Sequence, residues 1–188
     1  ADRYGLKIHL DGARLFNAVI ALGVSAAVVA RDADSVSFCL SKGLSAPVGS
    51  LVCGSAEFVR QARRQRKLLG GGMRQAGVLA AAGIIALETM VDRMAEDHAN
   101  ARCLADGLAL LPGIVLDPAR IQTNIVIFEL APGDPAAAGF AAGMAAHGVK
   151  VGVVAPRRIR AVTHYGIDAN GIEQTLVAAK AVLEKSRT

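Results

Sequence analysis

Between residues 1 and 69, short apolar stretches of strand length alternate with longer stretches whose apolar residues recur at helical spacing. The pattern predicts strands over 7–11, 36–40 and 50–53. It also predicts a helix that ends at Leu22 and a second helix over 55–69, whose N-terminus Ser55 can cap. Strands that alternate with helices are typical of an α/β protein.

The pattern changes after residue 72. From Met73 to about Leu111 nearly every position is compatible with a helix, and this length indicates either two helices or one long helix that joins two domains. Pro112 and Gly113 end the helical stretch, so we predict two domains, 1–111 and 112–188. The second is expected to be a small α+β unit with helices on one sheet face, in the order strand 125–130, helix 136–146, strands 149–154 and 159–163, and helix 171–185.

Composition narrows the protein class. The 188 residues are 53% hydrophobic but only 4% aromatic, and the longest apolar runs, 18–30 and 76–87, suit buried helices better than membrane spans. No signal-peptide pattern opens the sequence, and a start without methionine leads us to expect a chain that begins within a longer protein. Three cysteines without Cys-x-x-Cys spacing favour a reducing cytoplasm, and Cys39 and Cys53 are expected to be small buried side chains.

The net charge is +5, and the densest basic run spans residues 60–67. That run contains no aromatic residues for base stacking, and no nucleic-acid-binding motif accompanies it. We therefore expect no nucleic-acid partner. A cationic surface that serves small anions, such as a phosphate and a carboxylate, accounts for the same charge.

Two residues carry the candidate chemistry. Lys42 lies in a polar turn with Ser41 and Gly43, where two apolar strands meet, and partial desolvation there would make its amine a better nucleophile toward an aldehyde. The alternative is an ordinary solvated turn lysine. Asp11 ends the strand over 7–11, and in open α/β sheets the carboxyl ends of strands face the ligand crevice. Pyridoxal phosphate enzymes need a carboxylate of this kind beside the pyridine nitrogen.

Three motifs extend this pattern: His-Leu-Asp-Gly-Ala-Arg at 9–14, Leu-Ser-Lys-Gly-Leu-Ser-Ala-Pro-Val-Gly-Ser at 40–50, and Arg-Lys-Leu-Leu-Gly-Gly-Gly-Met-Arg-Gln at 66–75. Together they closely resemble the low-specificity threonine aldolases, and the chain resembles the C-terminal half of those enzymes. The resemblance implies part of a large fold type I domain that binds pyridoxal phosphate, followed by a small C-terminal α+β domain. It also implies cleavage of threonine-type β-hydroxy-α-amino acids to glycine and an aldehyde, in a homodimer or homotetramer.

The resemblance also implies roles for individual residues. Lys42 would hold the cofactor covalently, with Ser41 beside it, and Asp11 would bind the ring nitrogen. Arg74 would reach a cofactor phosphate across a subunit interface, and Lys67 would lie near the site. The substrate carboxylate would be bound by Arg160, helped by Arg14, and no metal ligands are expected.

Other interpretations stay open. The glycines at 70–72 could form a flexible connector, or their backbone amides could bind an anion where the next helix begins. Another fold type I enzyme, such as an aminotransferase or a β-eliminating lyase, would share Asp11 and Lys42. In the family, the histidine that stacks on the cofactor ring and the glycine-threonine phosphate loop belong to the N-terminal half. A truncated, inactive chain that serves only in assembly is therefore a further alternative.

Overall fold

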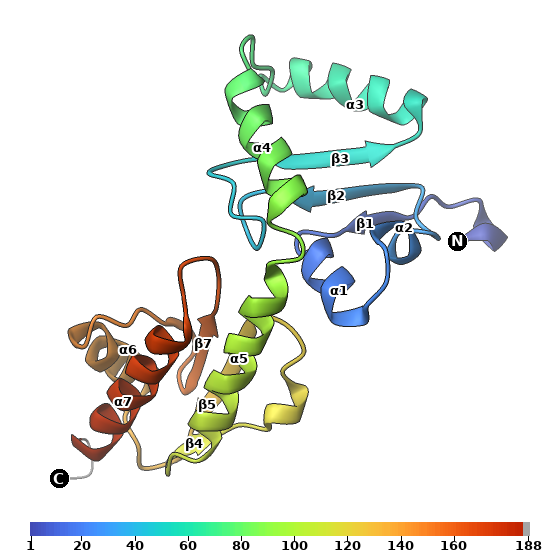
Figure 1. Ribbon diagram of the computed structural model, residues 1–188. Helices are drawn as coiled ribbons and strands as arrows, with labels where there is room; N and C mark the ends of the chain where they lie inside the picture. The colour runs from blue at the N-terminus through green and yellow to red at the C-terminus, as the bar shows by residue number, and fades with distance from the viewer. Residues whose placement is uncertain (186–188) are drawn as a thin grey trace. The chain divides into compact units, whose positions relative to one another are not determined.

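A computed structural model describes residues 1–185 of the chain, which form two compact units, Ala1–Met94 and a second unit from Ala95 onward. Figure 1 labels the α-helices and strands of the N-terminal unit, whose elements also include a short 3-10 helix. In chain order they are a 3-10 helix Asp2–Tyr4, β1 (His9–Asp11), α1 (Leu15–Leu22), α2 (Ala26–Val29), β2 (Ser35–Cys39), β3 (Ser50–Gly54), α3 (Ala56–Leu68) and α4 (Gly77–Thr89).

The N-terminal sheet has the strand order β1-β2-β3, with β1 and β2 parallel and β2 and β3 antiparallel. Alternation along β2 buries Val36 and Phe38 on one face, where the Phe38 ring meets the edge of Phe16 at a centroid distance of 5.2 Å. The intervening residues Ser37 and Cys39 lie on the opposite face and are half-buried. The apolar alternation therefore leaves a polar sheet face available for a site.

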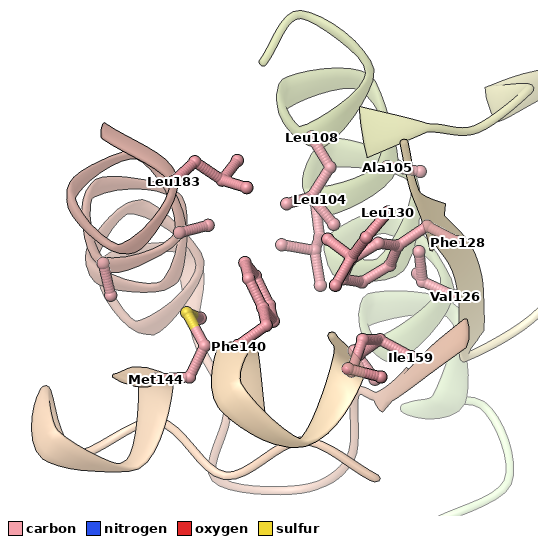
Figure 2. Close-up of a cluster of buried hydrophobic side chains, with 14 of the residues drawn as sticks. Leu104, Ala105, Leu108, Val126, Phe128, Leu130, Phe140, Met144, Ile159 and Leu183 are labelled. Atoms are coloured by element: carbon pink, nitrogen blue, oxygen red, sulfur yellow. The ribbon is translucent and has the colours of Figure 1, made fainter. Parts of the chain in front are cut away.

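The C-terminal unit contains a second, antiparallel sheet with the order β4-β5-β7-β6. Its elements are α5 (Met94–Ala109), β4 (Ile114–Val115), a 3-10 helix Pro118–Arg120, β5 (Ile125–Leu130), α6 (Ala137–Ala146), β6 (Gly152–Ala155), β7 (Arg158–Val162) and α7 (Ala169–Lys185). One sheet face packs against the helices. Figure 2 shows side chains from α5, β5, β7, α6 and α7 meeting in this core, with Phe140 fully buried among them and its ring edge-on to Phe128.

Most predicted elements are present, within a few residues of the predicted bounds. The helical stretch after Met73 forms two helices, α4 and α5, which was one of the two predicted alternatives. Sequence reasoning missed α2 and β4, which have four and two residues. Within residues 1–185, no helix is both long and apolar enough to cross a membrane.

The position of the division between the two units differs from the predicted domain boundary. The prediction placed it between residues 111 and 112, whereas the two compact units divide between Met94 and Ala95. The reason is the apolar side of α5, where Ala101, Leu104 and Leu108 are buried in the C-terminal core. The helix is thus part of the small unit and not only a connector.

Candidate active site

Asp11 is the last residue of β1, and a tight turn fixes the backbone that follows it. The Gly12 amide donates to the Ser37 carbonyl oxygen on β2 at 2.8 Å, and the Ala13 amide donates to Asp11 Oδ1 at 3.3 Å. A larger residue would be crowded at Gly12, because a Cβ atom there would lie 3.1 Å from the Ser37 carbonyl oxygen. The turn thus holds Asp11 at the carboxyl end of the parallel strand pair.

A cavity of about 250 Å³ opens beside Asp11. It lies over the polar face of the sheet and is lined by His9, Asp11, Ala13, Ser37, Phe38, Cys39 and Ser50. Its carboxylate can accept a hydrogen bond from a protonated ring nitrogen, and its hydroxyl groups can both donate and accept. The residues present therefore fit the nitrogen edge of a pyridine ring.

His9 contributes a hydrogen-bonded group to the same face. Its Nδ1 lies 2.8 Å from Ser35 Oγ and its Nε2 lies 3.3 Å from Ser37 Oγ. Both serines belong to β2, so the imidazole bridges alternate residues of the neighbouring strand.

Lys42 lies in the loop that joins β2 to β3, three residues beyond the end of β2. The Ser45 amide donates to the Lys42 carbonyl oxygen at 2.9 Å and closes a turn whose central residues, Gly43 and Leu44, are buried. Because these two residues take the buried positions, Lys42 itself is exposed, as is Ser41. The expected partial desolvation of the lysine is therefore wrong for this chain.

The topology nevertheless brings Lys42 and Asp11 to the same region of the N-terminal unit. β1 and β2 run parallel, so the end of β1 at Asp11 and the segment that leaves β2 toward Lys42 lie at the same sheet edge. Lys42 and Ser41 are not among the residues that line the Asp11 cavity. Arg14 caps the start of α1 through its backbone, three residues after Asp11, and is half-buried.

Lys67 and Arg74 flank the glycine run, and both are exposed. The amides of Gly70 and Gly71 donate to the carbonyl oxygens of Lys67 and Arg66 at 3.2 and 2.9 Å, so they terminate α3. The interpretation of these two amides as an anion site at the next helix is therefore wrong, since α4 begins only at Gly77. The positive φ of 79° at Gly70 suits this helix-ending role.

Arg160 lies on β7 in the C-terminal unit. Strand alternation buries Ile159 and leaves Arg160 half-buried on the sheet face away from the core. On the same face, Arg158 Nε donates to Glu129 Oε1 at 3.0 Å. Arg157 is half-buried and donates through Nε to the Leu130 carbonyl oxygen at 2.7 Å.

Sequence reasoning missed part of the cavity wall. Cys39, expected to be a small buried hydrophobic residue, is half-buried at the cavity, where its Sγ accepts a hydrogen bond from Ser50 Oγ at 3.5 Å. Cys53, for which burial was also expected, is exposed. The alternation of polar residues at 35, 37 and 39 was a usable signal, because a period of two places them on one sheet face.

Comparison with known proteins identifies the family. The family model described as beta-eliminating lyase matches residues 1–131. The chain belongs to this family. The match spans the whole N-terminal unit and the first part of the C-terminal unit of this beta-eliminating lyase family member.

Several curated relatives of this family member are threonine aldolases by name. A protein of Arabidopsis thaliana named "Probable low-specificity L-threonine aldolase 2" is 46% identical over 178 residues, which cover 94% of this chain and 50% of the relative. The low specificity L-threonine aldolase of Escherichia coli K12 is 39% identical over 180 residues, with 96% and 52% covered. The chain thus spans about half the length of these curated relatives.

Solved structures confirm the fold class of this family member. A Listeria monocytogenes protein whose structure is described as that of a "putative L-allo-threonine aldolase" superposes with a TM-score of 0.81 at 20% identity, covering 97% of this chain and 54% of the other. The predicted α/β class, with part of a larger domain followed by a small α+β domain of the kind found in fold type I enzymes, agrees with this similarity.

Proposed function

We propose that the chain is part of a pyridoxal-phosphate-dependent aldolase that cleaves β-hydroxy-α-amino acids of the threonine and allo-threonine type to glycine and an aldehyde. The observation that carries the proposal is the similarity to low-specificity threonine aldolases along nearly the whole chain. The cavity at Asp11 supports it, because a carboxylate at the end of a strand can bind the nitrogen of a pyridine ring.

Each predicted site residue has a place in this proposal. Asp11 would accept a hydrogen bond from the protonated ring nitrogen, and Lys42 would hold the cofactor covalently through its amine. Ser41 and Lys67 would contact the cofactor, and Arg74 would bind its phosphate. When bound, pyridoxal phosphate supplies an electron-withdrawing ring that stabilises negative charge at the substrate α-carbon.

Substrate orientation falls to the two remaining arginines. A planar guanidinium can bind a carboxylate with two parallel hydrogen bonds, so Arg160, helped by Arg14, fixes which bond of the α-carbon is aligned for cleavage. In the overall reaction the Cα–Cβ bond breaks, the β-hydroxyl group loses its proton to give the aldehyde, and the α-carbon gains a proton to give glycine.

We also propose that the protein acts as a homodimer or homotetramer in the cytoplasm. Helix α4 is apolar around its circumference, and its Val78 and Ile85 side chains are 76% and 61% exposed. A helix of that composition is normally buried, which supports a subunit interface. All three cysteines are free thiols, which is consistent with a reducing compartment.

The covalent link is tested by incubating the chain with pyridoxal phosphate, reducing it with borohydride and mapping the modified peptide by mass spectrometry. We expect the reduced adduct on Lys42 and its loss in Lys42→Ala. Lys150→Ala is the matched control, because Lys150 is also exposed but has no place in the proposed site. If the Lys42→Ala protein formed the reduced adduct in the same yield as the unsubstituted chain, the assignment of Lys42 would be refuted.

Reaction type is tested with the protein assembled at full length. Release of acetaldehyde and glycine from threonine supports the aldolase. Formation of a keto acid from the same substrate would instead favour an aminotransferase, the alternative that shares Asp11 and Lys42. Failure of the chain to acquire any adduct would favour a role in assembly alone.

A further inference from the structure

A buried polar contact joins β5 to β7 just beyond the ends of the two strands. Asn124 precedes β5 and is 1% exposed, and Thr163 follows β7 and is 2% exposed. The Thr163 amide donates to the Asn124 carbonyl oxygen at 3.0 Å, and Asn124 Nδ2 donates to the Thr163 carbonyl oxygen at 2.7 Å. Because a carbonyl oxygen can only accept, the side-chain nitrogen of Asn124 must face Thr163.

These two hydrogen bonds extend the ladder between the strands by one residue pair. Ile125 is paired with Val162, so Asn124 and Thr163 stand where the next pair would form. In a regular antiparallel ladder, the two residues of such a pair exchange both main-chain N–H···O bonds. Here the Asn124 side chain supplies the second of these bonds. The pairing therefore depends on a short side chain with an amide donor at position 124.

Thr163 also joins the sheet to α5. Its Oγ1 donates to the carbonyl oxygen of Asp97, in the first turn of that helix, at 2.6 Å. With this bond the N–H, carbonyl and hydroxyl groups of Thr163 are all hydrogen-bonded, as burial requires. A displacement of β7 along β5 would break these bonds where water cannot replace them, which is costly for buried groups.

Apolar burial alone does not fix the register of β5 and β7. Val126 on β5, and Ile159 and Ala161 on β7, are buried in the core, part of which Figure 2 shows. A shift by one residue would turn these side chains out of the core. A shift by two residues would keep every side chain on its own face, because the side-chain period of a strand is two. The Asn124–Thr163 contact distinguishes these registers, because it forms in only one of them.

The register of β7 sets the position of Arg160, which is paired with Ile127 and lies three residues before Thr163. A two-residue shift would move Arg160 by about 7 Å along β5, since a strand advances about 3.4 Å per residue. We propose that Asn124 and Thr163 are positioning residues for Arg160, an inference that rests on the proposed function. They fix the register of β7 and its attachment to α5, and thereby the place at which the guanidinium meets the substrate carboxylate.

The register is measured first, on the chain without cofactor, by nuclear magnetic resonance. Since the Thr163 amide donates to Asn124, the pair Ile127–Arg160 is of the non-hydrogen-bonded kind, in which the two Cα atoms lie about 4.5 Å apart. We expect a strong Hα–Hα contact between these two residues. Asn124→Ala should weaken this contact or add a second set of β7 signals.

Further substitutions serve as controls. Asn100→Ala removes a side-chain amide of α5 that donates to the Ile167 carbonyl oxygen at 2.8 Å, outside both strands, and it should leave the register unchanged. Thr163→Val keeps the approximate volume and loses the bond to α5, whereas Thr163→Ser retains the hydroxyl group. We expect Thr163→Ser to resemble the unsubstituted chain and Thr163→Val to weaken the Hα–Hα contact.

The effect on the substrate is measured second, with the protein assembled at full length and loaded with pyridoxal phosphate. Asn124→Ala should raise the KM for threonine by about three- to tenfold, the range expected when Arg160 loses about one hydrogen bond to the carboxylate. A simple loss of folded protein would instead lower the apparent kcat and leave KM unchanged. In Asn124→Ala/Arg160→Met the KM should equal that of Arg160→Met alone, because Asn124 acts only through the guanidinium.

The two measurements separate the possible failures. An unchanged Hα–Hα contact or an unchanged KM in Asn124→Ala overturns the positioning role, and so do additive effects in the double variant. If Arg160→Met leaves the KM for threonine unchanged, the proposed role of Arg160 fails and the positioning role fails with it. The magnetic resonance measurement then decides by itself whether Asn124 fixes the register of the two strands.

Discussion

Replacing Gly43 by alanine tests how the loop that carries Lys42 is held. A Cβ atom at this position would lie 2.6 Å from Met94 Sδ and 2.8 Å from Asn17 Oδ1. Both neighbours are buried, with Met94 fully inaccessible and Asn17 only 2% exposed. Neither side chain can therefore move into solvent without opening the N-terminal core.

The expected cost follows from this crowding. Gly43 has no positive φ, so an alanine is not strained by backbone conformation, and the penalty is steric. Overpacking of this kind typically costs about 1–3 kcal/mol. With a urea m-value of about 2 kcal/mol/M, the unfolding midpoint should fall by about 0.5–1.5 M. The turn should also shift, so borohydride trapping of pyridoxal phosphate on Lys42 should decrease.

The assay is urea unfolding followed by circular dichroism, with Gly77→Ala as the matched control. A Cβ atom at Gly77 would meet no atom within 4 Å, and the residue begins helix α4, so alanine there should be neutral or stabilising by up to about 1 kcal/mol. In Gly43→Ala/Met94→Ala the two penalties should not add, because the new methyl group occupies space left by the methionine. A Gly43→Ala protein as stable as the Gly77→Ala protein would refute the packing argument.

Two further predictions concern charged groups. The Lys7 ammonium and the Ile8 amide, which donate to Asp34 at 2.8 and 2.9 Å, hold the pKa of that carboxyl below its ordinary value of 3.8. The resulting stabilisation is present above that ordinary pKa and is lost as the pH falls through the lowered pKa of Asp34. The Asp34→Asn protein should therefore be less stable than the unsubstituted protein at pH 7, and this difference in stability should vanish in strong acid. An equal difference in stability at both pH values, measured by urea titration, would contradict this. Arg160→Met should weaken threonine binding to the cofactor-loaded protein about 10- to 100-fold, which is the loss expected for hydrogen bonds between charged groups. Arg158→Met, which removes the partner of Glu129, is the control and should change threonine affinity little. Both affinities are measured by calorimetric titration.

The sequence was informative wherever a periodic pattern coincided with burial. The strand at 125–130 was predicted with its observed bounds because Val126, Phe128 and Leu130 are buried on one face and the intervening residues are not. The strand that ends at Asp11 has a weaker alternation, with Leu10 half-buried between the exposed His9 and Asp11. Elements as short as β4 contain too few residues for a period to be visible, so no local pattern could reveal them.

Tertiary context decided the features that sequence reasoning missed. The exposure of Lys42 follows from which turn residues fill the core, and the buried positions of Gly43 and Leu44 are set by distant residues such as Asn17 and Met94. Likewise, the glycines at 70–72 contain no signal that distinguishes the end of α3 from an anion-binding start of α4. That distinction depends on which carbonyl oxygens the amides of Gly70 and Gly71 reach.

The composition of the candidate site depends on the register of two strands that are 26 residues apart in sequence. Asp11 is paired with Ser37, and His9 with Ser35, because Val36 and Phe38 are buried on the opposite face of β2. A shift of one residue would place those two apolar side chains beside Asp11 and turn the serines toward the core. The hydrophobic core therefore specifies the polar face as well, and substitutions at Val36 or Phe38 that loosen the register should impair cofactor binding without any contact to the cofactor.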